Sequence, residues 1–174
     1  MLQNPSYFAL VALSCLNALG CTGSTVPPKG TSITGESGGC GDFIAYRFNQ
    51  SRTAAVVITV DGDQLKLSEE PTLIDLGPET TGIRIEVYQF KHLAGTYFCD
   101  DVGGDPEPIA KWTVSGGNVR VTRKAAQPPT SLSIATHQVS IVLKNATITH
   151  NKTSAVADFG DVRLDDVWVG WYAG

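Results

Sequence analysis

Apolar and polar residues alternate with a period of two along most of the chain after residue 40, which is the pattern of half-buried β-strands. In residues 83–88, isoleucine and valine alternate with arginine, glutamate and tyrosine. Residues 54–60 form an apolar, β-branched run, and the Asp61-Gly62 signal after it predicts a tight turn into a strand over 64–67. No window has the 3.6-residue period of an amphipathic helix.

Turn signals divide this region into some nine to eleven short strands, which predicts an all-β fold. Residues 109–114 and 118–123 are expected to form a hairpin across residues 115–117, Ser-Gly-Gly. Two further pairs of strands are expected to be separate: 138–144 from 146–150, and 155–159 from 162–172. The favoured architecture is an antiparallel β-sandwich, with a closed barrel as the alternative.

Length and charge are those of one ordinary domain. The chain has 174 residues, enough for a single self-supporting core, which we place at residues 40–174. Its formal net charge is −4. Lysines and arginines are scattered, and only Arg123 and Lys124 are adjacent. We expect no nucleic-acid partner, because phosphate backbones are bound by clustered cations.

The first twenty residues have the features of a signal peptide. Residues 7–19 are mainly apolar, and this run is too short to cross a bilayer, for which about twenty residues are needed. Ala18 and Gly20 are small residues at positions −3 and −1 relative to Cys21. We therefore expect residues 1–20 to be removed on export, with an internal hydrophobic strand as an alternative.

The stretch Ala18-Leu19-Gly20-Cys21 resembles the lipobox of bacterial lipoprotein precursors. This resemblance implies cleavage before Cys21, acylation of its thiol and attachment to a membrane of the cell envelope. The residue after Cys21 is threonine and not aspartate, which favours the outer membrane or the periplasmic face. Acylation at Cys15 is less favoured, and an ordinary secretory signal with release of the protein is the alternative.

The number of cysteines that remain then predicts a disulfide. Removal of Cys15 and acylation of Cys21 leave Cys40 and Cys99 as an even pair in an oxidising compartment. A Cys40–Cys99 disulfide would stabilise the fold by about 4 kcal/mol through loop closure. Two unrelated buried thiols are the alternative.

Residues 21–39 are expected to be the anchor cysteine and a flexible linker. They are rich in Gly, Ser, Thr and Pro, and they bury too little apolar surface to offset the entropy of ordering. As a coil, the linker has an average reach of about 20–25 Å, enough to hold a domain away from a membrane.

The sequence around the second cysteine, Gly95-Thr96-Tyr97-Phe98-Cys99, is similar to the Tyr-x-Cys corner of immunoglobulin domains. No tryptophan lies between Cys40 and Cys99, and a long part of the chain follows Cys99. A general antiparallel sandwich is therefore preferred to immunoglobulin topology.

Two acidic groups are weak candidates for calcium, which prefers several oxygen ligands from a flexible loop. A solvated turn is the alternative for both groups. They are Asp100, Asp101, Asp105 and Glu107, and Asp158, Asp161, Asp165 and Asp166.

No catalytic site, zinc site or cofactor is predicted. His92, His137 and His150 are dispersed, and both cysteines of the domain are expected in the disulfide.

Aromatic residues near the end of the chain are candidates for a sugar-stacking platform: Trp168, Trp171 and Tyr172. In a strand, however, the two tryptophans face opposite sides of the sheet because their separation is odd. We therefore expect a non-enzymatic interaction or structural module of the cell envelope, tethered to a membrane by lipid and bound to an envelope protein. A carbohydrate- or calcium-binding module is the alternative.

Overall fold

The computed structural model describes residues 26–95, 98–99, 107–126 and 135–170. In these residues, eight strands form one antiparallel hydrogen-bonded sheet in the order β1-β2-β3-β5-β6-β7-β8, with β4 also paired to β6. A short 3-10 turn, η1 (Gly30–Ser32), precedes the sheet. The strands are β1 (Ser37–Cys40), β2 (Ile44–Phe48), β3 (Ala54–Val60), β4 (Thr72–Leu76), β5 (Ile83–Gln89), β6 (Ala110–Ala125), β7 (His137–His150) and β8 (Val156–Val169).

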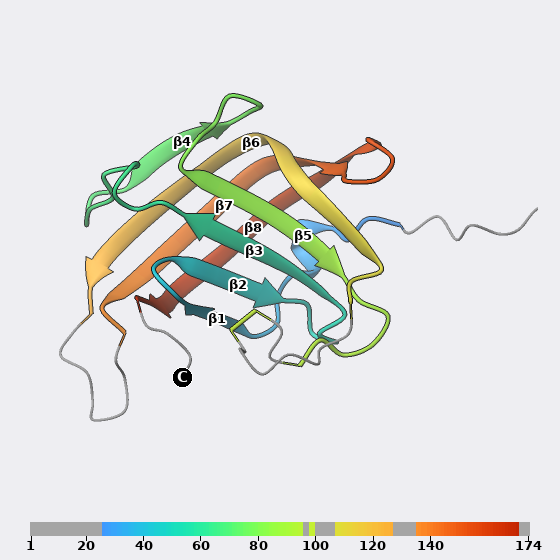
Figure 1. The fold of residues 1–174 in the computed structure, drawn as a ribbon, viewed down its shortest axis with the longest axis horizontal. Helices are drawn as coiled ribbons and strands as arrows, with labels where there is room; N and C mark the ends of the chain where they lie inside the picture. The colour runs from blue at the N-terminus through green and yellow to red at the C-terminus, as the bar shows by residue number, and fades with distance from the viewer. Residues whose placement is uncertain (1–25, 96–97, 100–106, 127–134, 171–174) are drawn as a thin grey trace, which may run out of the picture.

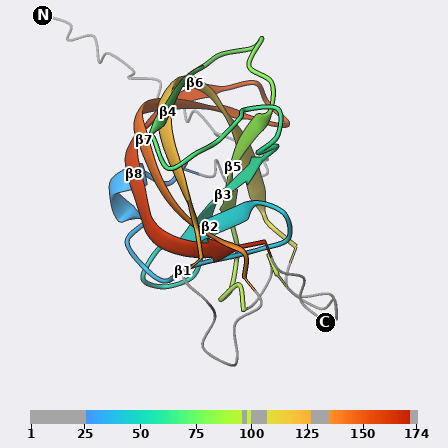
Figure 2. The ribbon, with the colours of Figure 1, turned by 90° about the vertical axis from the view of Figure 1, so that its left-hand side faces the viewer.

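The sheet curls into a half-barrel, so that its first and last strands come together. In Figure 1, β2, β3 and β5 cross in front of the long strands β6, β7 and β8, and Figure 2 shows the curl from the side. The predicted all-β antiparallel fold with a Cys40–Cys99 disulfide is confirmed. The described strands belong to one curled sheet, and not to the two separate sheets of the expected sandwich.

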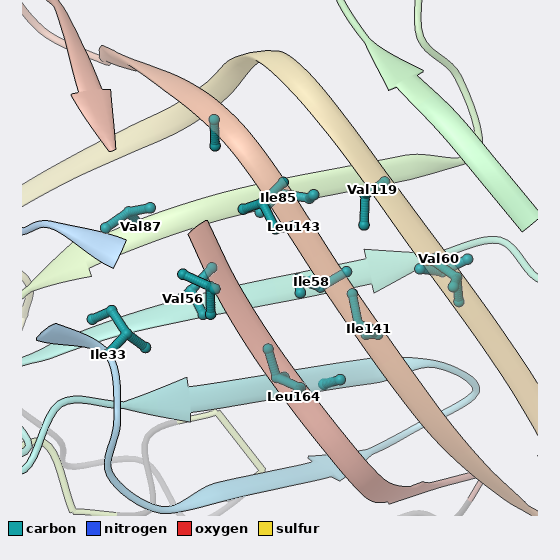
Figure 3. Packing of buried hydrophobic residues seen from close by; sticks show 14 of the residues in the cluster. Ile33, Val56, Ile58, Val60, Ile85, Val87, Val119, Ile141, Leu143 and Leu164 are labelled. Atoms are coloured by element: carbon teal, nitrogen blue, oxygen red, sulfur yellow. The ribbon is translucent and has the colours of Figure 1, made fainter. Parts of the chain in front are cut away.

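The core fills the concave side of the sheet. Alternate residues of each strand point into it, because successive side chains of a strand lie on opposite faces. Burial of an apolar side chain of this size contributes about 1.5–3 kcal/mol, so the period of two determines which face turns inward. The buried residues that Figure 3 labels are Ile33, Val56, Ile58, Val60, Ile85, Val87, Val119, Ile141, Leu143 and Leu164.

The half-barrel is closed by the segment 29–41, which runs alongside β8 in the same direction. At the end of this seam, the Gly41 carbonyl oxygen accepts a hydrogen bond from the Gly170 amide, with an N···O distance of 2.7 Å. Glycine allows the backbones to approach: a Cβ added to Gly39 would lie 2.7 Å from the carbonyl oxygen of Trp168. The close approach of the two backbones and this hydrogen bond therefore close the seam.

The segment expected to be a flexible linker is ordered in its second half. Ile33 is only 2% exposed and belongs to the main core, and β1 pairs with β2. Arg47 on β2 holds the segment by donating hydrogen bonds to the carbonyl oxygens of Gly35 (3.1 Å) and Thr34 (3.3 Å). Just before η1, the Lys29 ammonium donates a hydrogen bond to the Asp158 carbonyl oxygen of β8 (2.7 Å).

The hairpin predicted across residues 115–117 is wrong, because one continuous strand, β6, passes through them. Gly117 has a φ of +105°, and a Cβ there would lie 2.6 Å from the Lys144 carbonyl oxygen of β7. The register of the β6–β7 pair shifts on both sides of Gly116. The glycines therefore bend the strand where the sequence pattern indicated a turn.

Irregularities in β7 and β8 lie beside this bend and form a crease across the three strands. Asn145 has a φ of 51°, and Gly160 of β8, with a φ of +88°, pairs with Ala146. Asp161 accepts hydrogen bonds from the Lys144 ammonium (2.6 Å) and from the Asn145 amide (2.9 Å). The hydrogen bond from Lys144, and next the one from Asn145, hold the pKa of Asp161 below its ordinary value.

The structure differs from the expected strands at three further places. Residues 64–67 form a turn in which the Leu65 amide donates to the Asp61 carbonyl oxygen (3.1 Å), and Leu67 is buried in the core. The expected strands over 138–150 are fused in β7, and those after residue 155 are fused in β8. The described residues therefore contain eight strands where nine to eleven were expected.

After β5 the chain folds back over the convex face of the sheet. We call residues 91–95 and 98–99 the strap. The Cys40–Cys99 disulfide, with a Cα–Cα distance of 5.9 Å, joins the strap to β1. The Phe98 ring lies 5.3–5.6 Å from the rings of Tyr46, Phe48 and Tyr88. A second, smaller apolar cluster is thus formed between the strap and the sheet.

Candidate functional site

A cleft opens beside the bend in β6. β4 pairs with β6 as far as Gly117, and β5 pairs with it only up to Thr113. Among the described strands, none pairs with residues 114–116 on this side of β6. A cavity of about 520 Å³, which we call the fork cleft, lies in the gap. It is lined by Leu76, Gly77, Pro78, Thr80, Ile83, Arg84, Ile85, Thr113, Val114 and Ser115.

The cleft exists because β5 pairs with β3 along its whole length but with β6 only over Glu86–Gln89. Its first residues follow β3, with Ile83 paired to Val60 and Ile85 paired to Ile58, and it joins β6 only at Glu86. Two strand edges thus diverge, and each edge carries backbone donors and acceptors, which favour a polar partner when buried. The cleft combines apolar walls with hydroxyl and guanidinium groups, which is typical of binding sites.

Arg84, on the wall of the cleft, is positioned by the buried carboxylate of Glu86, which is only 8% exposed. Oε1 of Glu86 accepts hydrogen bonds from Arg84 Nη2 (2.5 Å) and Lys111 Nζ (2.8 Å), and Oε2 accepts one from the Tyr88 hydroxyl (2.8 Å). Lys111 Nζ also lies 4.9 Å from the centroid of the Tyr88 ring.

The pKa values in this network follow from burial and hydrogen bonding. Burial raises the pKa of Glu86, but the hydrogen bonds from Lys111 and Tyr88 outweigh it and hold this pKa below its ordinary value. Burial lowers the pKa of Lys111, yet hydrogen bonding to Glu86 and Tyr88 raises it overall. The pKa of Tyr88 is raised, mainly by burial. The carboxylate is thus kept ionised and engaged by three donors, an arrangement that orients Arg84.

A second cavity, of about 350 Å³, lies at the end of the half-barrel where β6 ends and β7 begins. Arg123 and His137 line it together with Asp42 and Asp63. Arg123 donates a hydrogen bond to the Leu67 carbonyl oxygen (3.0 Å), so it also fastens the loop after β3. Burial, and next the charge of Arg123, lower the pKa of His137.

The structure brings together two of the predicted site residues, Cys40 and Cys99. Cys21 lies outside the described residues, as do three of the calcium candidates, Asp100, Asp101 and Asp105. Glu107, the fourth, is exposed. Among the described residues, no three His, Cys, Asp or Glu side chains are grouped so as to hold a metal ion. In the same part of the chain, no helix is long and apolar enough to cross a bilayer.

The histidines lie in different places: His92 is exposed after β5, His137 lines the second cavity, and His150 packs edge-on against Trp112 at 5.3 Å. Trp168 is 42% exposed on β8. The other two candidates for a sugar platform, at positions 171 and 172, lie outside the described residues.

Sequence patterns did not identify the fork cleft or the network at its wall. A partial signal was present, because Arg84, Glu86 and Tyr88 alternate with apolar residues and therefore share the convex face. Lys111 comes from another strand, and only the β5–β6 pairing brings it to Glu86. Comparison with known proteins adds no relative: no family model, curated protein or solved structure matches the chain.

Proposed function

We propose that the chain is a non-enzymatic interaction module of a bacterial cell envelope, attached to a membrane by acyl chains on Cys21. In this proposal, the module binds an extended segment of an envelope protein in the fork cleft. The observation that supports it is the divergence of β4 and β5, which leaves residues 114–116 of β6 beside a cavity of about 520 Å³.

An extended segment fits this site for two reasons. Its backbone can hydrogen-bond to the free edge of β6, which is how sheets commonly bind peptides. Its side chains can meet the partly buried Ile83 and Val114 on the walls and the guanidinium of Arg84 on the rim. We therefore expect a partner segment that carries an apolar side chain next to an acidic one.

A binding role also agrees with the chemistry of Glu86. A general base must be free to accept a proton from a substrate. Here both carboxylate oxygens already accept hydrogen bonds, from Arg84, Lys111 and Tyr88. The network is therefore better suited to hold the wall of the cleft than to transfer protons.

Site-specific photo-crosslinking in the native host tests the proposal. A photo-reactive amino acid is placed at Ser115, which lines the cleft, or at Ser140, on the convex face of β7. The cleft is then blocked with Gly77→Trp, because an added Cβ at Gly77 has no atom within 4 Å and the larger side chain enters open space. Ser140→Trp is the matched control for the added bulk.

We expect one envelope protein to be crosslinked from Ser115 and not from Ser140, and Gly77→Trp to abolish that product while Ser140→Trp preserves it. Equal crosslinking from both positions, or a product that persists with Gly77→Trp, would refute binding in the cleft. Intact-mass spectrometry of the same preparations tests the anchor: the mature chain should begin at Cys21, carry acyl chains and lack the two hydrogen atoms that are lost when the disulfide forms.

A further inference from the structure

Exposed apolar side chains gather at one end of the half-barrel. We call it the anchor end and define it by residues 26–29, the β2–β3 turn, the strap residues 91–95, residues 107–109 and the β7–β8 turn with the first residue of β8. In Figure 1 this is the right-hand side, where the chain enters. Six large apolar side chains are exposed among the described residues, and four belong to this end: Val26, Leu93, Ile109 and Val156.

Hydrogen bonds show that these segments share one end. The Lys29 ammonium donates to the carbonyl oxygen of Asp158 (2.7 Å), just after the start of β8. The Asn151 amide in the β7–β8 turn donates to the Lys111 carbonyl oxygen (3.0 Å), near the start of β6. The strap reaches the β2–β3 turn through the Ala94 amide, which donates to the carbonyl oxygen of Arg52 (3.0 Å).

Charge is distributed unequally between the two ends. The described connecting segments of the anchor end contain Lys29, Arg52, Lys91 and Lys152 against Glu107. Two of these cations are paired with acidic residues beside them, Lys29 with Asp158 (3.1 Å) and Arg52 with Glu36 (2.6 Å), so Lys91 and Lys152 carry the excess of positive charge. At the opposite end the connecting segments 41–43 and 61–71 contain one cation, Lys66, against five acidic residues, and Arg123 and Lys124 at the end of β6 add two cations. The acidic residues are Asp42, Asp61, Asp63, Glu69 and Glu70. Asp100, Asp101 and Asp105 lie outside the described residues and do not enter this comparison.

We call residues 22–29, between Cys21 and η1, the spacer, and its length limits the anchor end to within about 30 Å of the membrane. Fully extended, these eight residues span at most about 26–29 Å, and as a coil they average about 14–17 Å. A domain held this close meets the bilayer with the end from which the spacer leaves.

We propose that the anchor end docks on an anionic lipid surface. This inference rests on the proposed function, since it takes Cys21 as the anchor. The four exposed apolar side chains enter the interfacial region, and the cations around them lie at the headgroups, the arrangement by which peripheral segments bind such surfaces. The acidic end then points away from the membrane.

Fluorescence quenching by lipids tests the docking on the mature protein reconstituted in vesicles. An environment-sensitive label is attached to Val156→Cys at the anchor end or to Leu73→Cys on β4, two positions of matched exposure at 68% and 66%. Vesicles of phosphatidylethanolamine with phosphatidylglycerol are compared with vesicles of phosphatidylcholine alone, both containing a headgroup quencher. Lys152→Glu is added to the Val156→Cys protein, with Lys124→Glu, at the opposite end of β6, as its control.

We expect quenching at position 156 and not at 73, stronger on the anionic vesicles. Lys152→Glu is expected to lower the ratio of docked to undocked protein about fivefold for each unit of charge changed, and Lys124→Glu to leave it unchanged. Equal quenching at both positions, or none at 156, overturns the inference. Intact mass distinguishes the two proposals, because an acylated chain without quenching at 156 refutes docking alone, whereas a chain without acyl groups refutes the anchor.

Discussion

Removal of the disulfide is expected to release the strap as well as to loosen the unfolded chain. In the double variant Cys40→Ala/Cys99→Ala, the lost constraint on a loop of 59 residues costs about 4 kcal/mol. The strap then depends on the packing of Phe98 and on hydrogen bonds such as that from Ala94 to Arg52. We expect this packing to be too weak to offset the entropy of ordering the strap.

Phe98→Ala measures whether the strap stays in place. In the disulfide-bonded protein, the half-buried ring contacts Tyr46, Phe48 and Tyr88, so its loss is expected to cost about 2 kcal/mol. In the disulfide-free protein, the same substitution should cost almost nothing, because the ring has already left the cluster. The coupling energy between the two changes is therefore about 2 kcal/mol.

Guanidinium unfolding of the four proteins, followed by tryptophan fluorescence, gives this coupling energy. Trp112 is buried in the main core and reports its unfolding. Ile141→Val is the control, since it lies in the main core and should cost about 1 kcal/mol in both backgrounds. If Phe98→Ala costs the same with and without the disulfide, the strap holds by packing alone and the reasoning is refuted.

Three further predictions concern the sheet. Lys111→Met removes one donor to the buried Glu86 carboxylate and should lower the free energy of unfolding by about 3 kcal/mol, measured in urea; an unchanged midpoint would contradict this. The pKa of Glu86 is lower in the folded state than in the unfolded state, where it is near 4.3. Its contribution to the free energy of unfolding is therefore complete above the unfolded-state pKa and is lost as the pH falls through the folded-state pKa. In Glu86→Gln, the free energy of unfolding should therefore fall less steeply with decreasing pH than in the original protein. Equal slopes at acid pH would contradict this role of Glu86. Gly117→Ala should cost about 3 kcal/mol or more, and Gly77→Ala less than about 0.5 kcal/mol, in thermal unfolding; equal losses would refute the role of Gly117 in the crease.

Features that depend on neighbouring residues could be predicted from the sequence. The apolar run of β3 has the predicted bounds, because alternation and turn residues act within a few positions. The Cys40–Cys99 pair followed from the number of cysteines, which needs no geometry.

Features that depend on distant partners could not be predicted. Residues 115–117 have the composition of a turn, and their role in a bend depends on the backbone of β7 that approaches Gly117. The order of residues 30–39 depends on one isoleucine, Ile33, which reaches a core made by other strands, and on the hydrogen bonds that Arg47 of β2 donates to the segment. Composition averages over such a residue and therefore indicated a flexible linker.

The crease and the anchor end together limit where a partner must lie. β6 begins at Ala110, at the anchor end, and Ser115 in the fork cleft is five residues further along the strand. At a rise of about 3.3 Å per residue, the cleft is about 17 Å from that end along the strand. With the anchor end on the bilayer, the cleft would face a layer within about 20 Å of the membrane surface. A partner segment must then lie within about 20 Å of the membrane surface. Lengthening the spacer 22–29 with Gly/Ser residues should therefore weaken crosslinking from Ser115 while acylation at Cys21 remains unchanged.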